Sequence, residues 1–182
     1  MVVQSRAAAL TIPRALLEGE VADFVEERFE GLLDVPVEFV RAARRSAVTE
    51  LGQVAQLAQA LAELDDPALD RLHTAYSRAD RLAGRSEEAA AQLNPDLLGE
   101  QTEIDLAREV GRLGPEIQGA LQAGDIHGAL RAAAELGEPV DRFFEDILVM
   151  AEDSQVRANR LRLLLDVRDA LALVGDFGQI PR

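Results

Sequence analysis

Arginine is the residue type in this sequence that is best suited to holding a ligand, and all 19 basic residues are Arg. A guanidinium group is planar, forks onto phosphate oxygens and stacks on bases. Arg71, Arg78, Arg81 and Arg85 follow one another at seven, three and four residues. At about 100° per residue they share one side of a helix, where they could hold a phosphate backbone or stack on unpaired bases. The pattern alone favours a solvated flank, paired with nearby carboxylates: Asp70, Asp80 and Glu87.

Two further groups place arginine at the ends of expected helices. Asn159 stands between Arg157 and Arg160, and Asn is a poor residue for a helix interior because its amide competes for backbone hydrogen bonds. This Asn therefore indicates a fixed polar contact. A hydrogen bond that holds the last helix to its neighbours is the interpretation that physics alone favours. The third group closes a short helix: Arg41, Arg44 and Arg45.

The sequence offers no recognisable catalytic or metal-binding pattern. It has no Cys, which excludes disulfides, thiolate zinc sites and thiol nucleophiles. His73 and His127 are far apart and lack the short spacing of metal motifs. Neither a glycine-rich phosphate loop nor a serine nucleophile motif is present. We therefore expect no catalytic residue, no metal and no cofactor in this segment.

The net charge of −14 bears on possible partners. Phosphates attract Lys and Arg and repel carboxylates, so this charge argues against nucleic acid, although a local arginine surface could still bind RNA. An acidic helical module for protein interaction or subunit assembly is the alternative that the charge favours. The apolar runs are too short to span a bilayer and no signal segment opens the chain, so we expect a cytoplasmic protein with no membrane partner.

Helix-forming residues dominate, and their apolar periodicity predicts an all-α fold of roughly seven helices. Asp65 and Asp66 before Pro67 predict a helix start, with an Asp cap and Pro in the first turn. Thr102 with Asp105 resembles a capping box, and Pro115 could break the helix that follows. Phe143, Ile147 and Met150 are expected to share one side of a buried helix. Helices are expected over residues 13 or 14 to 33, 37–45, 49–64, 65–83, 102–121, 124–136, 139–150 and 153–174, with a short helical piece over residues 96–99.

The strongest resemblance to a known family lies near the end of the chain. Residues 140–153 contain two Phe, acidic residues and a Val-Met run, and Arg157, Asn159, Arg160 and Leu161 follow. This block resembles the C-terminal signature of the β subunit of bacterial glycyl-tRNA synthetase. Residues 24–33, 76–82 and 94–98 resemble other stretches of the same family in collinear order. The family's Lys falls at Ser77 here, its Asn falls at Arg81, and the chain is much shorter than a complete β subunit.

The resemblance implies a multi-helix bundle of the DALR type, which is similar to the anticodon-binding domain of arginyl-tRNA synthetase. It implies that residues 21–175 form this domain, after a lead-in helix or linker over residues 1–20 and before a tail over residues 176–182. It further implies a non-catalytic segment of a glycine–tRNA ligase that binds the anticodon end of glycine tRNA, and not DNA. The rest of the β subunit and an α subunit that holds ATP and glycine would be its protein partners.

Joined with the arginine pattern, the resemblance predicts the tRNA-binding residues. Arg78 and Arg81 come first. The remaining candidates follow in order: Arg157, Asn159 and Arg160, and then Arg41, Arg44 and Arg45.

Overall fold

A computed structural model describes Arg28, residues 30–83 and residues 86–181. The chain divides into two compact units, Met1–Asp34 and Val35–Arg182. In the first unit Arg28 and Glu30 are helical. The lead-in segment over residues 1–20, the proposed domain start at residue 21 and most of the helix expected up to residue 33 lie outside the described residues. The elements from Val35 onward belong to the second unit.

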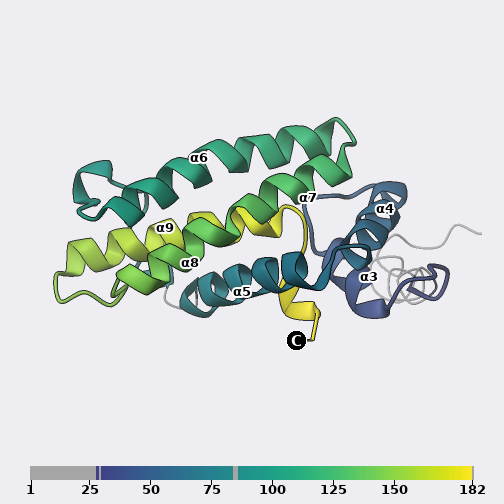
Figure 1. The fold of residues 1–182 in the computed structure, drawn as a ribbon, viewed down its shortest axis with the longest axis horizontal. Coiled ribbons are helices and arrows are strands. Elements are labelled where there is room, and N and C mark those ends of the chain that lie inside the picture. Colours follow the sequence, from purple (N-terminus) through teal and green to yellow (C-terminus); the bar gives the residue numbers. More distant parts are fainter. Residues whose placement is uncertain (1–27, 29, 84–85, 182) are drawn as a thin grey trace, which may run out of the picture. The chain divides into compact units, whose positions relative to one another are not determined.

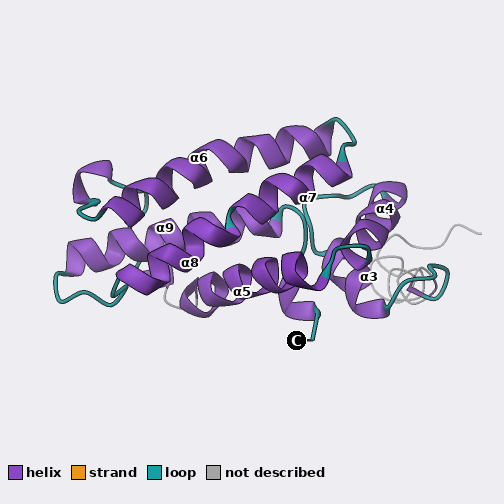
Figure 2. Ribbon diagram, viewed as in Figure 1, coloured by secondary structure: helices purple, strands orange, loops and turns teal. Residues whose placement is uncertain are grey.

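The second unit is helical, and its described part contains no strand (Figure 2). The all-α prediction is therefore confirmed. In the described part, short 3-10 helices stand among the α-helices: η2 (Ser86–Glu88), η3 (Pro95–Leu97) and η4 (Phe177–Gln179). The α-helices are α3 (Val37–Arg44), α4 (Leu51–Ala62), α5 (Asp66–Ala83), α6 (Gln101–Gln122), α7 (Ile126–Glu135), α8 (Gly137–Asp146) and α9 (Ser154–Ala172).

Long helices pack side by side around one apolar core (Figure 1). α5 packs against α9 and α8, while α6 packs against α7, α8 and α9. Their inward faces carry side chains that are fully buried, among them Leu72, Leu106, Phe143 and Leu164. The α3–α4 pair packs against η4 and α7, at the end of the unit away from the α8–α9 connection. The hydrophobic periodicity of the sequence therefore becomes a helical bundle.

Aspartates begin several of these helices, because a side-chain oxygen can accept from the amides left unpaired in the first turn. The Ala68 amide donates to Asp65 at 2.7 Å, and the Gly128 amide donates to Asp125 at 2.8 Å. The predicted helix start before Pro67 is thus confirmed. The capping box read from Thr102 and Asp105 is wrong, because α6 begins at Gln101 and Glu103 accepts the Glu100 amide at 2.9 Å.

Two helix boundaries differ from the sequence prediction. α6 continues through Pro115, whose missing amide leaves the exposed Gly111 carbonyl open to water, so the helix is not broken there. α8 ends at Asp146 rather than near Met150. Of the residues expected on one helix side, Phe143 is buried within α8 and Ile147 is buried from the loop that follows, whereas Met150 is only partly buried.

Residues 176–181, which the sequence analysis assigned to a tail, pack into the core. Phe177 is 0 % exposed and Ile180 is 3 % exposed. The Asp176 amide donates to the Ala42 carbonyl at 3.1 Å. Gly175 has a φ of +150°, and a Cβ there would stand 3.3 Å from the same carbonyl. The chain therefore turns at a glycine and returns to the bundle to bury two apolar side chains.

In the part of the chain that the structure describes, none of the helices has the length and apolar composition that a membrane span requires.

The packing of the C-terminal segment can be tested with Phe177→Ala. Removing this buried ring should lower the free energy of unfolding by about 3–5 kcal/mol, because the core loses apolar contact and keeps a cavity. Urea unfolding followed by circular dichroism would measure the loss. Leu51→Ala, at a side chain that is 53 % exposed, is the control and should change stability by less than about 1 kcal/mol. A loss for Phe177→Ala as small as the control's would mean that the segment is detached.

Candidate nucleic-acid interface

The predicted site residues lie in two separate places. Arg78 and Arg81 stand in the last turns of α5, and the group from Arg157 to Arg160 stands in the first turns of α9. Both lie toward the end of the bundle where α8 is joined to α9 (Figure 1). The arginines of α3 lie toward the opposite end. The structure therefore brings the first two groups to one end and excludes the third from it.

Arg78 is half-exposed and combines an ion pair with an aromatic contact. Its Nη1 donates to Asp141 of α8 at 2.9 Å, and both side chains are 43 % exposed. Its guanidinium carbon lies 5.5 Å from the centre of the Phe144 ring, within the range of a cation–π contact. An exposed ion pair of this kind contributes only about 0–1 kcal/mol, so a phosphate could replace the carboxylate.

Arg81 is exposed, and it makes no ion pair with the part of the chain that the structure describes. It lies one helical turn beyond Arg78 on α5. Arg81 is therefore the predicted cation that a phosphate could approach without displacing a carboxylate.

Arg160 turns inward and forms a buried ion pair. Its Nε donates to Glu103 of α6 at 2.5 Å, and its Nη1 donates to the Leu148 carbonyl at 2.9 Å. Glu103 is 0 % exposed, and its other oxygen accepts the amides of Gly99 and Glu100 at 2.9 Å each. Burial opposes the charged form of Glu103, but the hydrogen bonds from Arg160 and from the two amides hold its pKa below the usual range. The guanidinium of Arg160 thus forms its hydrogen bonds within the protein, with Glu103 and Leu148.

Asn159 is 1 % exposed, and both the nitrogen and the oxygen of its side-chain amide form hydrogen bonds with backbone atoms. Its Nδ2 donates to the Asn94 carbonyl at 3.0 Å, and its Oδ1 accepts the Asn94 amide at 2.7 Å. The side-chain amide therefore satisfies both the backbone N–H and the backbone carbonyl of residue 94, and it fixes that residue against α9. This is the structural hydrogen bond that an Asn in a helix interior indicated, and it leaves no surface for a nucleotide.

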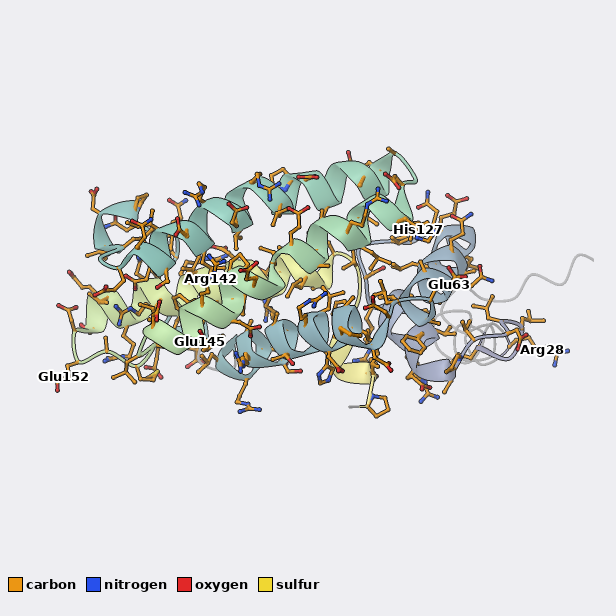
Figure 3. The ribbon with its side chains drawn as sticks, in the orientation of Figure 1. Arg28, Glu63, His127, Arg142, Glu145 and Glu152 are labelled. Carbon is orange, nitrogen blue, oxygen red and sulfur yellow. The ribbon has the colours of Figure 1, made fainter. Side chains whose placement is uncertain are left out.

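Arg157 also serves the protein itself. Its Nη1 donates to the Ala151 carbonyl at 2.8 Å, and its Nε lies 3.7 Å from a carboxylate oxygen of Glu88. Two arginines of α9 thus hold carbonyls of the loop between α8 and α9. Figure 3 shows Glu152 at the outer end of this loop.

The α3 group lies beside the C-terminal segment. Arg45 Nη1 donates to Asp176 at 3.0 Å, while Arg41 is exposed and Arg44 is half-buried. Burial disfavours the charge of Asp176, yet hydrogen bonds from Arg45 and Gln179 keep its pKa below the usual range. Burial and the charge of Asp176 raise the pKa of the neighbouring Tyr76 to about 12. This cluster fastens α3, α5 and the C-terminal segment to one another.

A groove of about 730 Å³ between α5, α6 and α8 contains arginines that the sequence analysis did not single out. Arg112 donates to Glu109 at 2.8 Å and to Glu135 of α7 at 2.7 Å, and Arg108 pairs with Asp105 at 2.9 Å. Arg142, labelled in Figure 3, pairs with Glu138. In the sequence these arginines have the spacing of ordinary solvent-exposed helix faces. Only the folded chain shows that they line one groove. Because carboxylates accompany them, the groove is mixed in charge rather than positive.

Comparison with known proteins relates the chain to a family. Residues 72–176 match the model of the DALR anticodon binding domain, a range that begins inside α5 and ends just after α9. The chain belongs to this family. Arg78, Arg81 and the α9 group lie inside the matched range of the DALR domain, whereas the α3 arginines lie before it.

Three relatives of this DALR chain share one name. It is 34% identical over 88% of its length to the glycine–tRNA ligase β subunit of Paracidovorax citrulli and 33% identical over 91% to that of Pseudomonas aeruginosa. It is 30% identical over 94% to that of Moorella thermoacetica. The resemblance read from residues 140–161 is therefore confirmed. The chain spans about a quarter of the length of these relatives, between 23% and 25%.

The buried carboxylate makes stability depend on pH in a defined direction. The pKa of Glu103 is lower in the folded chain than its usual 4.5. Its contribution is therefore complete above that value and is lost as the pH falls through the folded pKa. Glu103→Gln should cost about 3 kcal/mol at pH 7, because Arg160 keeps its charge and loses its partner.

Urea unfolding between pH 7 and pH 3 measures the difference in free energy of unfolding between the unsubstituted chain and Glu103→Gln. The contributions of the other carboxylates cancel in this difference, because both chains contain them. The gap between the unsubstituted chain and Glu103→Gln should narrow as the pH falls. A gap of constant size would contradict an ionised Glu103. Glu152→Gln, at an exposed carboxylate, is the control and should match the unsubstituted chain within about 0.5 kcal/mol throughout.

Proposed function

We propose that this chain is the anticodon-binding region of a glycine–tRNA ligase β subunit and binds the anticodon end of glycine tRNA. The DALR match over α5–α9, together with relatives that are glycine–tRNA ligase β subunits, carries the proposal. The segment contributes recognition to an aminoacyl-tRNA synthetase of the cytoplasm rather than chemistry. The rest of the β subunit and an α subunit with ATP and glycine would complete the enzyme.

The end of α5 is the proposed place of first contact with RNA. Single-stranded loops present unstacked bases and open phosphates, which guanidinium planes recognise by stacking and by paired hydrogen bonds. Arg81 is exposed for a phosphate, and Arg78 stands beside the Phe144 ring with a weak exposed partner. A phosphate that replaces Asp141 at Arg78 would cost little, because the exposed pair contributes so little.

A second candidate function has its own support. The net charge is −14, and many of the arginines described above pair with carboxylates, as Arg112 does with three of them. An acidic helical module that docks proteins without touching RNA would have such a surface. The two candidates differ in one cheap measurement, which is the affinity of the chain for RNA.

Titration with glycine tRNA and with an anticodon-substituted version separates these candidates. Anticodon recognition predicts tighter binding of the natural tRNA, by about tenfold or more if one good base contact is lost on substitution. Fluorescence anisotropy of labelled tRNA would follow the binding. Equal affinity for both tRNAs would reject anticodon recognition, and no binding of either would favour the protein-docking module.

The role of Arg81 has a distinct signature in salt. If its guanidinium binds a phosphate, Arg81→Ala should weaken tRNA binding and reduce the slope of log affinity against log salt by about one. Titrations at several salt concentrations measure this slope. Arg131→Ala on α7, another exposed arginine, is the matched control and should leave the slope unchanged. An equal slope in both variants would remove Arg81 from the interface.

A further inference from the structure

The loop between α8 and α9 presents one apolar side chain from a fixed backbone. Ile147 and Val149 are each 7 % exposed, whereas Leu148 between them is 73 % exposed. Ile147 is extended, with φ −111° and ψ 123°, and alternate residues of an extended chain point to opposite sides. The two buried neighbours therefore anchor the loop in the core and direct Leu148 to the solvent.

Arginine side chains of α9 fasten the same loop from beneath. Arg160 Nη1 holds the Leu148 carbonyl at 2.9 Å, while its Nε is held by Glu103. Arg157 Nη1 holds the Ala151 carbonyl at 2.8 Å. The Arg160 side chain is only 14 % exposed and Glu103 is fully buried, so this support comes from the interior of the bundle. The planar fork of Arg160 presents two different nitrogens, Nε to the carboxylate and Nη1 to the carbonyl, in one fixed plane, whereas a Lys ammonium is a single point charge on a flexible stem.

We propose that Arg160 is a positioning residue for RNA binding and that Leu148 is the contact it positions. The inference rests on the proposed function, and it assigns to Arg160 a role without contact to phosphate. Leu148 would pack against the face of an unpaired base, an apolar contact that carries no charge. Because the loop is already fixed, binding there would require little further ordering of the backbone, which favours affinity.

Two substitutions at Arg160 separate positioning from phosphate contact. Arg160→Lys keeps the charge and loses the planar fork with its two donor nitrogens, whereas Arg160→Gln loses both the charge and the fork. Positioning predicts that both variants bind glycine tRNA about fivefold to tenfold more weakly, with the salt slope of the unsubstituted chain. A phosphate contact predicts instead that Lys preserves most of the affinity and that Gln reduces the slope by about one. This second result would overturn the inference.

Leu148→Ala tests the contact with the base and leaves the buried ion pair between Glu103 and Arg160 unchanged. Its side chain is exposed, so the melting temperature should stay unchanged while affinity for glycine tRNA falls several-fold. Adding Arg160→Lys to Leu148→Ala should then weaken binding by much less than it does alone, because both changes act through one contact. Unchanged affinity for Leu148→Ala, or fully additive losses in the double variant, would contradict the proposal. The single variant Leu148→Ala tests the contact even if the Arg160 variants fail to fold.

Asp125→Ala is the control for loss of stability alone. Asp125 accepts the Gly128 amide at the start of α7, far along the chain from the loop, so its removal should lower the melting temperature and leave tRNA affinity unchanged. Failure of the unsubstituted chain to bind glycine tRNA would overturn the proposed function and this inference together. Normal binding combined with an unaffected Leu148→Ala would overturn this inference alone.

Discussion

The ion pair between Glu103 and Arg160 is the interaction on which the arrangement of this end of the bundle depends. Burying two charges is costly, and the cost is offset only when the remaining donors and acceptors are satisfied. Here both carboxylate oxygens of Glu103 accept hydrogen bonds, and Arg160 also holds the Leu148 carbonyl. One pair thereby connects the start of α6, the first turns of α9 and the loop after α8. The neighbouring contact of Asn159 with Asn94 adds residue 94 to the same assembly.

Buried and exposed arginines have different roles in this molecule. The buried guanidinium of Arg160 cannot leave Glu103 without stranding a charge, so it is suited to support. Exposed pairs such as Arg78 with Asp141 contribute little to stability and can exchange partners with an arriving phosphate. This distinction explains how a chain with a net charge of −14 can belong to a family of anticodon-binding domains. Attraction for RNA would come from a few exposed cations, while many other arginines neutralise local carboxylates.

Local signals in the sequence predict local structure well. Apolar periodicity places most of the helices, and Asp65 caps the helix start that precedes Pro67, because capping depends on residues three apart. Contacts between residues that are far apart in the sequence cannot be predicted from local spacing. Nothing in the spacing of Arg78 points to Asp141, which lies 63 residues away. The apolar run after Asp146 is typical of a helix, yet it is a loop whose Leu148 and Ala151 carbonyls accept hydrogen bonds from arginines of α9, which lie far along the chain.

The candidate site shows the same division. Sequence reasoning found the block around Asn159 and its polar contact, because an amide inside a helix is unusual in itself. It could not find Glu103, since a glutamate near a helix start is common and its burial depends on a partner in α9. Nor could it foresee that Phe177 returns to the core, because one Phe after a glycine turn carries no periodicity.

Chemical-shift mapping with an RNA hairpin that carries the glycine anticodon loop tests the central claim most directly. The claim predicts that amide signals move along the last turns of α5, at Phe144 and in the loop around Leu148, while the Nε–H signal of Arg160 keeps its position. A hairpin that shifts only the α3 signals, or shifts the Arg160 guanidinium as strongly as that of Arg81, would contradict it.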